Sequence, residues 1–179
     1  MNQIATVERH GVADAAVPSG QYLTLVLAGE TYAIGTLAIK EIIEHAQMTR
    51  VPMLPGSIRG VINVRGAVVP VVDLGVKFGN GLTAIGRRTC IVIAELEIEG
   101  EARDMGILVD TVNEVIEIAA SDIEPAPAFG ARIRADFIAG MCKSKDQFIV
   151  ILDLARVLSM DEMAVLTRIE PSEVATPEG

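Results

Sequence analysis

The chain repeats its own sequence pattern, and this duplication limits the folds that it can adopt. Segment 33–44 (AIGTLAIKEIIE) resembles segment 106–117 (GILVDTVNEVIE), which lies 73 residues later. Two further matches follow at an offset of 80 residues, of 58–60 with 138–140 and of 69–74 (VPVVDL) with 149–154 (IVILDL). Three matches in the same order favour a duplication over a chance likeness between strand-forming segments.

Each copy is short for an independent fold, because a unit of about 65 residues has only a marginal core. Two copies packed face to face can bury apolar surface that neither copy buries alone. Half of the 179 residues are apolar but only 3% are aromatic, so any core must be aliphatic. The duplication therefore predicts two β-barrels that share a seam.

Short apolar runs separated by glycine and proline supply the expected strands. These runs are 22–27, 60–64, 67–74, 89–98 and 148–154, with turns at 28–30 and 65–66. Runs of this length and spacing are typical of barrels and sandwiches. Pro70 lies inside its run, which predicts an edge strand or a bulge because proline cannot donate to the ladder.

Two segments favour short helices instead. Segment 36–44 places its aliphatic residues where one or two helical turns could hold them, and 161–168 begins with acids and ends with Arg168. The expected division is a flexible arm at 1–20, a first barrel at 21–80 and a linker at 81–88. A second barrel follows at 89–160, and a short helix with a disordered acidic tail at 161–179.

Charge and hydropathy exclude several classes of protein. The net charge of −9 offers no basic footprint for nucleic acid and no polybasic stripe for anionic lipid. The longest uncharged stretch, 15–29, is interrupted at 18–21 and is too short to cross a bilayer. The first residues lack the layout of a signal peptide, so the expected compartment is the cytoplasm.

Few residues could carry catalysis or hold a metal. His10 and His45 have no second ligand at a metal-binding spacing, and Cys90 and Cys142 lie in apolar segments that predict buried free thiols. No nucleophile or phosphate-binding motif occurs. Asp73 and its counterpart Asp153 each precede a leucine, and we expect them to cap strand ends rather than to form a catalytic dyad. The sequence therefore predicts neither metal nor cofactor.

Segments in both halves resemble one known family. The runs YLTLVLAGETYAI, IKEIIE, TRVP and IRGVINVRGAVVPVVDL lie in the first half, and GILVDTVNEVIEI, DIEPAP, FIAG and FIVILDLARVL in the second. Over about residues 21–160 the chain resembles the CheW family of chemotaxis coupling proteins. Many members have an arginine after the Asp-Leu pair, where this chain has Gly75.

The resemblance implies an all-β fold of two intertwined five-stranded SH3-like barrels that share a core, with short helices between strands and near the C-terminus. It implies a non-enzymatic adaptor between the cytoplasmic tips of membrane chemoreceptors and the regulatory domain of the histidine kinase CheA, in arrays at the inner face of the membrane. A paralogous coupling protein of a surface-motility or biofilm array is the alternative. A small-molecule-binding barrel or an enzyme would instead need convergent polar groups in a pocket.

The resemblance also assigns candidate contact residues. The receptor-binding candidates are Ile39, Glu41, Arg65, Val68 and Val115, and the kinase-binding candidates are Met48, Val51 and Gly60. Each has a structural alternative. The resemblance pairs Glu41 with Arg65, and the alternative is an exposed ion pair worth only about 0–1 kcal/mol. The apolar receptor-binding candidates can instead belong to the core, and Gly60 and Val51 can simply shape a turn.

Overall fold

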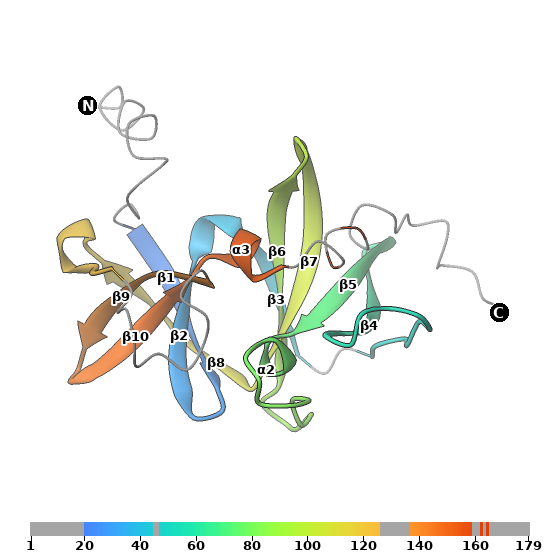
Figure 1. The fold of residues 1–179 in the computed structure, drawn as a ribbon, viewed down its shortest axis with the longest axis horizontal. Coiled ribbons are helices and arrows are strands. Elements are labelled where there is room, and N and C mark those ends of the chain that lie inside the picture. Colours follow the sequence, from blue (N-terminus) through green and yellow to red (C-terminus); the bar gives the residue numbers. More distant parts are fainter. Residues whose placement is uncertain (1–19, 45–46, 126–136, 159–161, 163, 165–179) are drawn as a thin grey trace.

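Two five-stranded sheets lie side by side in the computed structural model, which describes residues 20–44, 47–125, 137–158, 162 and 164 (Figure 1). The first sheet has the order β8-β1-β2-β10-β9, and the second has the order β3-β6-β7-β5-β4. The strands of the first sheet are β1 (Gly20–Leu27), β2 (Glu30–Gly35), β8 (Thr111–Ile118), β9 (Ile138–Ser144) and β10 (Gln147–Leu152). Those of the second are β3 (Ile39–Glu44), β4 (Ile58–Val64), β5 (Ala67–Asp73), β6 (Cys90–Ile98) and β7 (Glu101–Val109).

Short helices join the strands, as the expected fold class requires. They are the 3₁₀ turns η1 (Thr36–Ala38) and η2 (Ala120–Asp122) and the single-turn helices α2 (Leu74–Lys77) and α3 (Leu154–Val157). Helix α3 lies at the upper end of the seam between the sheets and α2 at its lower end (Figure 1). The predicted all-β fold with two five-stranded units is therefore confirmed. No helix within the described part of the chain is long and apolar enough to span a membrane.

Each sheet takes strands from both copies of the repeat. The first sheet combines hairpin β1–β2 of the first copy with β8, β9 and β10 of the second, and the second sheet reverses this exchange. The seam of each sheet is a parallel pair, β2 with β10 and β5 with β7, while the other pairs are antiparallel. The expected division at the linker 81–88, with one barrel at 21–80 and a second at 89–160, therefore does not separate the two sheets.

The turns preserve the duplication in their backbone conformation. Arg65 and Gly66 have φ of 53° and 89°, and their counterparts Lys145 and Asp146 have 53° and 66°. Positive φ at both central residues is the signature of the type I′ turn, whose twist matches that of a hairpin. The two copies therefore share local geometry as well as strand order.

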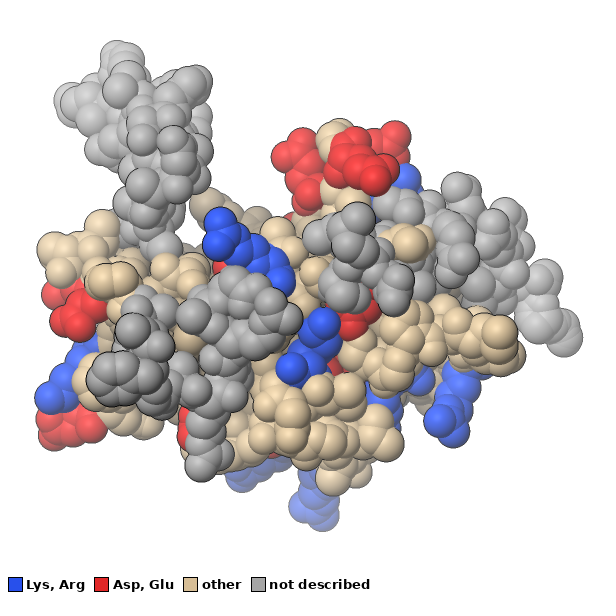
Figure 2. Space-filling view, in the orientation of Figure 1, with Lys and Arg blue, Asp and Glu red and all other residues tan. Residues whose placement is uncertain are grey.

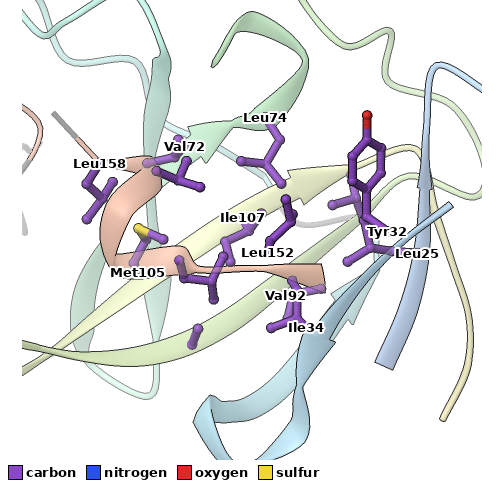
Figure 3. Packing of buried hydrophobic residues seen from close by; sticks show 14 of the residues in the cluster. Leu25, Tyr32, Ile34, Val72, Leu74, Val92, Met105, Ile107, Leu152 and Leu158 are labelled. Atoms are coloured by element: carbon purple, nitrogen blue, oxygen red, sulfur yellow. The ribbon is translucent and has the colours of Figure 1, made fainter. Parts of the chain in front are cut away.

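A large apolar cluster between the two sheets is the shared core. It contains Leu25 and Ile34 from the first sheet, Val92 and Ile107 from the second, and Leu154 from α3. Figure 3 shows that these side chains and their neighbours fill the space between the sheets. Two smaller clusters fill the two curled sheets separately, one in each.

Strands β6 and β7 are buried on both faces over residues 90–94 and 105–109. In β6, Ile91 and Ile93 point into the core of the second sheet, while Val92 and Ala94 point into the shared core. Because successive side chains of a strand point to opposite faces, burial on both sides demands an unbroken apolar run. This accounts for the continuous sequence CIVIA at the start of β6.

The helical prediction for 36–44 is wrong beyond its first turn. Only η1 is helical, and the residues that follow form strand β3, in which half-buried and exposed positions alternate strictly. Ile39, Glu41 and Ile43 are half-buried, whereas Ile42 is exposed. Pairing with β6 satisfies the backbone and selects this two-residue period over the helical one.

The edge-or-bulge prediction for Pro70 is also wrong. Pro70 lies opposite Val61 in β5, which has a neighbour on each side. Val61 exchanges both of its backbone hydrogen bonds with Thr49, at 2.8 and 2.9 Å, so it needs none from Pro70. The parallel ladder with β7 begins only at Val71, so the missing N–H of Pro70 costs no ladder bond.

The two predicted tails lie largely outside the described residues. Only Gly20 of the arm 1–20 is described, and of 161–168 only Glu162 and Ala164 are, both of them helical. Both histidines, His10 and His45, also lie outside the described residues.

The strand exchange predicts how the chain behaves when it is divided. Fragments 1–80 and 81–179 each carry only part of either sheet, so neither should fold alone, while a mixture of the two should recover β structure. Circular dichroism and amide NMR spectra of the separate and mixed fragments measure this. A stable, native-like fragment 1–80 would show that one copy suffices for a fold.

Candidate protein-binding surfaces

A groove of about 560 Å³ opens at the seam between the sheets. Its walls come from the start of β1, the end of β2 with η1, and the junction of β10 with α3, and Leu96 of β6 supplies the second sheet's part. Leu37 of η1 lines this groove and is fully exposed, and Tyr22 and Leu154 lie deeper in its wall. An exposed apolar groove of this kind is typical of a site that binds another protein.

Glu41 and Arg65 meet across the second sheet. The Arg65 guanidinium, at the tip of the β4–β5 hairpin, donates to Glu41 Oε1 on β3 at 2.8 Å. The Arg65 side chain is 79% exposed and that of Glu41 26%, so the pair adds about 0–1 kcal/mol to stability. The structure thus contains the pair that the resemblance implied.

The same pair recurs in the first sheet. Glu114 on β8 and Lys145 at the tip of the β9–β10 hairpin are the repeat counterparts of Glu41 and Arg65, and their charged atoms lie 3.7 Å apart. In each strand the residue after the glutamate is an exposed apolar one, Ile42 after Glu41 and Val115 after Glu114. Each sheet therefore presents an ion pair at the same place.

The other receptor-binding candidates do not gather at one point. Ile39 is half-buried against the shared core, and Val68 is half-buried opposite Asn63 in the β4–β5 hairpin. Val115 belongs to the first sheet, where it is exposed opposite Leu23. Glu41 and Arg65 are brought together, whereas Val115 lies in the other sheet.

The kinase-binding candidates lie on or next to the segment around Thr49, which pairs with Val61 at the edge of strand β4. Met48 packs against the core of the second sheet, and Val51 lines a second hollow of about 520 Å³. Gly60 is buried, and a Cβ added there would lie 2.6 Å from Thr49 O. Gly60 therefore lets the segment at Thr49 lie against β4, and it presents no side chain to a partner.

The second hollow joins two loops that are distant in the sequence. Residues 50–56 form most of its wall, and Leu82 from the loop after α2 completes it. Exposed apolar residues that the sequence reasoning missed are Leu37, Met53, Leu82, Ile85 and Phe148. Met53, Leu82 and Ile85 lie in glycine- and proline-rich segments of the sequence, where no strand pattern accounts for an apolar residue. An apolar residue in such a segment is a sequence signal for an exposed apolar side chain.

Asp73 is fully buried and bonded on both oxygens. Oδ1 accepts from Gly75 N at 2.8 Å and Thr83 Oγ1 at 2.6 Å, and Oδ2 accepts from Thr83 N at 2.9 Å and the Arg59 guanidinium at 2.7 Å. The capping prediction is confirmed for Asp73. It is wrong for Asp153, which makes no capping bond and lies 3.6 Å from Arg156 Nε.

A second buried polar cluster holds Glu162 against the second sheet. Lys77 Nζ lies 2.8 Å from Glu162 Oε1, and the Ser57 hydroxyl donates to the other carboxylate oxygen. The Lys77 ammonium also lies 5.8 Å from the centre of the Phe137 ring. These contacts bind residue 162 to α2 and to the start of β4.

The cysteines are buried and free, as predicted. Burial raises the pKa of the Cys90 thiol, and the nearby Glu44 carboxylate raises it further. Burial likewise raises the pKa of the Cys142 thiol, with a contribution from Asp122. Within the described ranges, no three His, Cys, Asp or Glu residues form a group that could hold a metal ion.

Comparison with known proteins identifies the family. The CheW-like domain family matches residues 21–162, which is most of the chain. The chain belongs to the CheW-like family. It is 32% identical over 152 residues to the chemotaxis protein CheW of Klebsiella aerogenes, covering 85% of this chain and 89% of that protein. The crystal structure of the scaffolding protein TtCheW from Thermoanaerobacter tengcongensis matches with a TM-score of 0.71 and 31% identity, covering 83% and 93% of the two chains.

The CheW-like family extends to differently named proteins. Protein FrzA of Myxococcus xanthus is 27% identical over 132 residues, covering 73% of this chain and 79% of that protein. CheW-family members are scaffold proteins of chemotaxis, and this chain has their domain and their fold, together with one exposed apolar groove at the seam.

The raised thiol pKa values predict a loss of stability at alkaline pH. Above about pH 8.5 a thiol in the unfolded chain ionises while the buried thiol keeps its proton, so the unfolded state binds fewer protons and the free energy of unfolding falls. Urea unfolding between pH 7 and 10 should show this decline. The Cys90→Ala/Cys142→Ala double variant should show a shallower one, and equal slopes would contradict the prediction.

Proposed function

We propose that this CheW-family protein is a non-enzymatic adaptor that couples the cytoplasmic tips of membrane chemoreceptors to the regulatory domain of the histidine kinase CheA. Its place is in receptor arrays at the inner face of the membrane. The observation that carries the proposal is the apolar groove at the seam of a CheW-like fold, with a fully exposed leucine on its wall.

The seam groove suits a helical receptor tip. An amphipathic helix laid into an apolar groove is an established mode of protein recognition, with apolar anchors spaced along one helix face. Leu37 and Ala38 line this groove, and Ile39 follows them directly at the start of β3. Because Val115 lies in the other sheet, a receptor hairpin that reaches both Ile39 and Val115 has to cross the seam.

The Glu41–Arg65 pair orients the receptor-facing hairpin in this proposal. The hairpin carries Val68 three residues beyond Arg65, so the direction of its tip also sets the position of Val68. An exposed pair of small energetic value can be changed without unfolding the protein. This makes Arg65 a direct probe of coupling.

The kinase-facing surface includes Met48 and Val51, with Gly60 acting through the backbone of Thr49. Two hydrogen bonds between Thr49 and Val61 hold this segment on the edge of β4. A partner at this edge would meet the exposed loop 50–56 and the second hollow. The proposed receptor and kinase surfaces thus use different parts of the molecule.

A different array is the second candidate function. The similarity to FrzA supports a coupling protein whose receptors and kinase belong to a chemosensory system other than chemotaxis. Affinity purification of the full-length protein from its own cells, followed by identification of the bound kinase, separates the two.

Charge reversal at Arg65 tests the receptor surface. Arg65→Glu places a second carboxylate beside Glu41, and we expect it to abolish receptor control of the kinase while the melting temperature changes by no more than a few degrees. The control is Lys143→Glu, a charge reversal at an exposed position of β9 that belongs to neither proposed surface, and it should leave coupling intact. Unfolding of the Arg65 variant would assign the pair a structural role instead.

Substitution of Leu37 tests the seam groove. Leu37→Asp should weaken binding to a receptor fragment about tenfold, since an exposed apolar anchor is replaced by a charge, and should leave kinase binding unchanged. Phe148→Asp, at an exposed position outside the groove, is the control. Equal receptor affinity in both variants would exclude the groove as the receptor site.

Reconstitution tests the function as a whole. Receptor fragments, kinase and this protein are combined, and ATP turnover is followed. Stimulation should require all three components. Turnover by the purified chain alone, or kinase stimulation that does not need the chain, would contradict the proposal.

A further inference from the structure

Three exposed apolar side chains gather in two loops at one end of the second sheet. Met53 is 96% exposed, Leu82 64% and Ile85 58%. Met53 and Leu82 line the same hollow of about 520 Å³, whose wall also includes Val51. Ile85 follows Leu82 by three residues in the loop that leads from α2 to β6. This surface is therefore continuous with the proposed kinase-facing residue Val51.

Buried contacts hold the loop of Leu82 and Ile85 in place. Thr83, between these two residues, is buried and donates to Asp73 through both its backbone N–H and its hydroxyl. The Arg59 guanidinium donates to Thr83 O at 3.0 Å as well as to Asp73. Farther along, Gly86 N donates to Thr89 Oγ1 at 2.7 Å. The apolar side chains consequently project from a fixed backbone, which lowers the entropy cost of binding a partner.

Gly75 makes this arrangement possible. A Cβ at Gly75 would lie 2.6 Å from Thr83 Oγ1 and 2.8 Å from Gly81 O, closer than packed atoms approach. A larger residue at this position, such as the arginine of many relatives, would displace Thr83 from Asp73. The departure from the family pattern at Gly75 thus accompanies a loop that is seated on the second sheet.

The charges at this surface are of one sign. Arg50 and Arg59 line the hollow, and none of the described residues adds a carboxylate to its wall, although the chain as a whole carries a net charge of −9. Arg87 and Arg88, both exposed, follow Ile85 in the same loop. Acidic side chains gather at the opposite end, around the tip of the β6–β7 hairpin (Figure 2). A partner surface with apolar and acidic side chains would match this end of the molecule.

We infer that the loop Gly79–Thr89 is part of the kinase-facing surface, with Leu82 and Ile85 as apolar anchors beside Met53. The contacting surface of the kinase regulatory domain is apolar and carries carboxylates that face Arg50 and the Arg87–Arg88 pair. This inference rests on the proposed function and deepens it, because it adds a loop that contains none of the candidate contact residues.

The test measures binding of the full-length protein to the isolated kinase regulatory domain by calorimetry. The Leu82→Ser/Ile85→Ser variant should bind at least about tenfold more weakly, as loss of central apolar anchors does, while its affinity for a receptor fragment stays unchanged. The control is Phe148→Ser, which removes a similarly exposed apolar side chain from the first sheet and should leave kinase binding unaffected.

Charge and loop position are tested separately. Arg50→Glu/Arg87→Glu should weaken kinase binding and reduce its dependence on salt concentration. Gly75→Arg and Thr83→Val leave all the anchors in place but release the loop, so each should weaken kinase binding without changing receptor binding. Circular dichroism establishes whether these two variants remain folded. The Leu82→Ser/Ile85→Ser variant tests the inference even if they do not.

The outcomes separate this inference from the proposed function. Unchanged kinase affinity in the Leu82→Ser/Ile85→Ser variant, together with loss of binding in Val51→Glu, would overturn the inference and leave the function standing. Failure of the wild-type protein to bind either kinase domain or receptor fragment would overturn the function itself. If the loop variants change only self-association, measured by sedimentation, the surface serves a second copy of the chain and the inference is wrong.

Discussion

The apolar layer between the two sheets is the interaction on which the rest of this structure depends. Each copy of the repeat gives one hairpin to the other copy's sheet, so β6 and β7 are covered on both faces and Val92 and Ile107 are completely buried. Neither sheet could retain its strands without this layer, because the parallel pairs β2–β10 and β5–β7 exist only when both copies are present. The apolar groove at the seam is a consequence of this exchange.

The two copies keep a common framework and differ in their polar contacts. Hairpin turns, strand order and the ion pairs at the hairpin tips are shared, as Arg65 and Lys145 illustrate. The equivalent aspartates are not: Asp73 is buried and holds a loop, whereas Asp153 stays partly exposed at the edge of the seam groove. Divergence of this kind lets a duplicated fold offer different surfaces to different partners.

A scaffold has to present apolar surface without losing solubility or shape. Several exposed apolar side chains of this protein, such as Leu82 and Ile85, stand on short loops, and Thr83 fixes the loop that bears both. The net charge of −9 and the acidic tip of the β6–β7 hairpin counteract self-association. Recognition by such a surface then depends on where the rigid loops meet.

The sequence alone determined the duplication, the strand-forming runs and the aliphatic core, because apolar periodicity and turn residues are local properties. It also carried the CheW resemblance and the pairing of Glu41 with Arg65. Only the tertiary structure decided that 39–44 is a strand, that Pro70 lies inside a sheet and that each sheet draws on both copies. These outcomes depend on which distant strand forms hydrogen bonds with the backbone of a given segment. The proximity of Leu82 and Met53 likewise depends on contacts between distant segments. A sequence read along its length does not contain that information, since such contacts join residues through space.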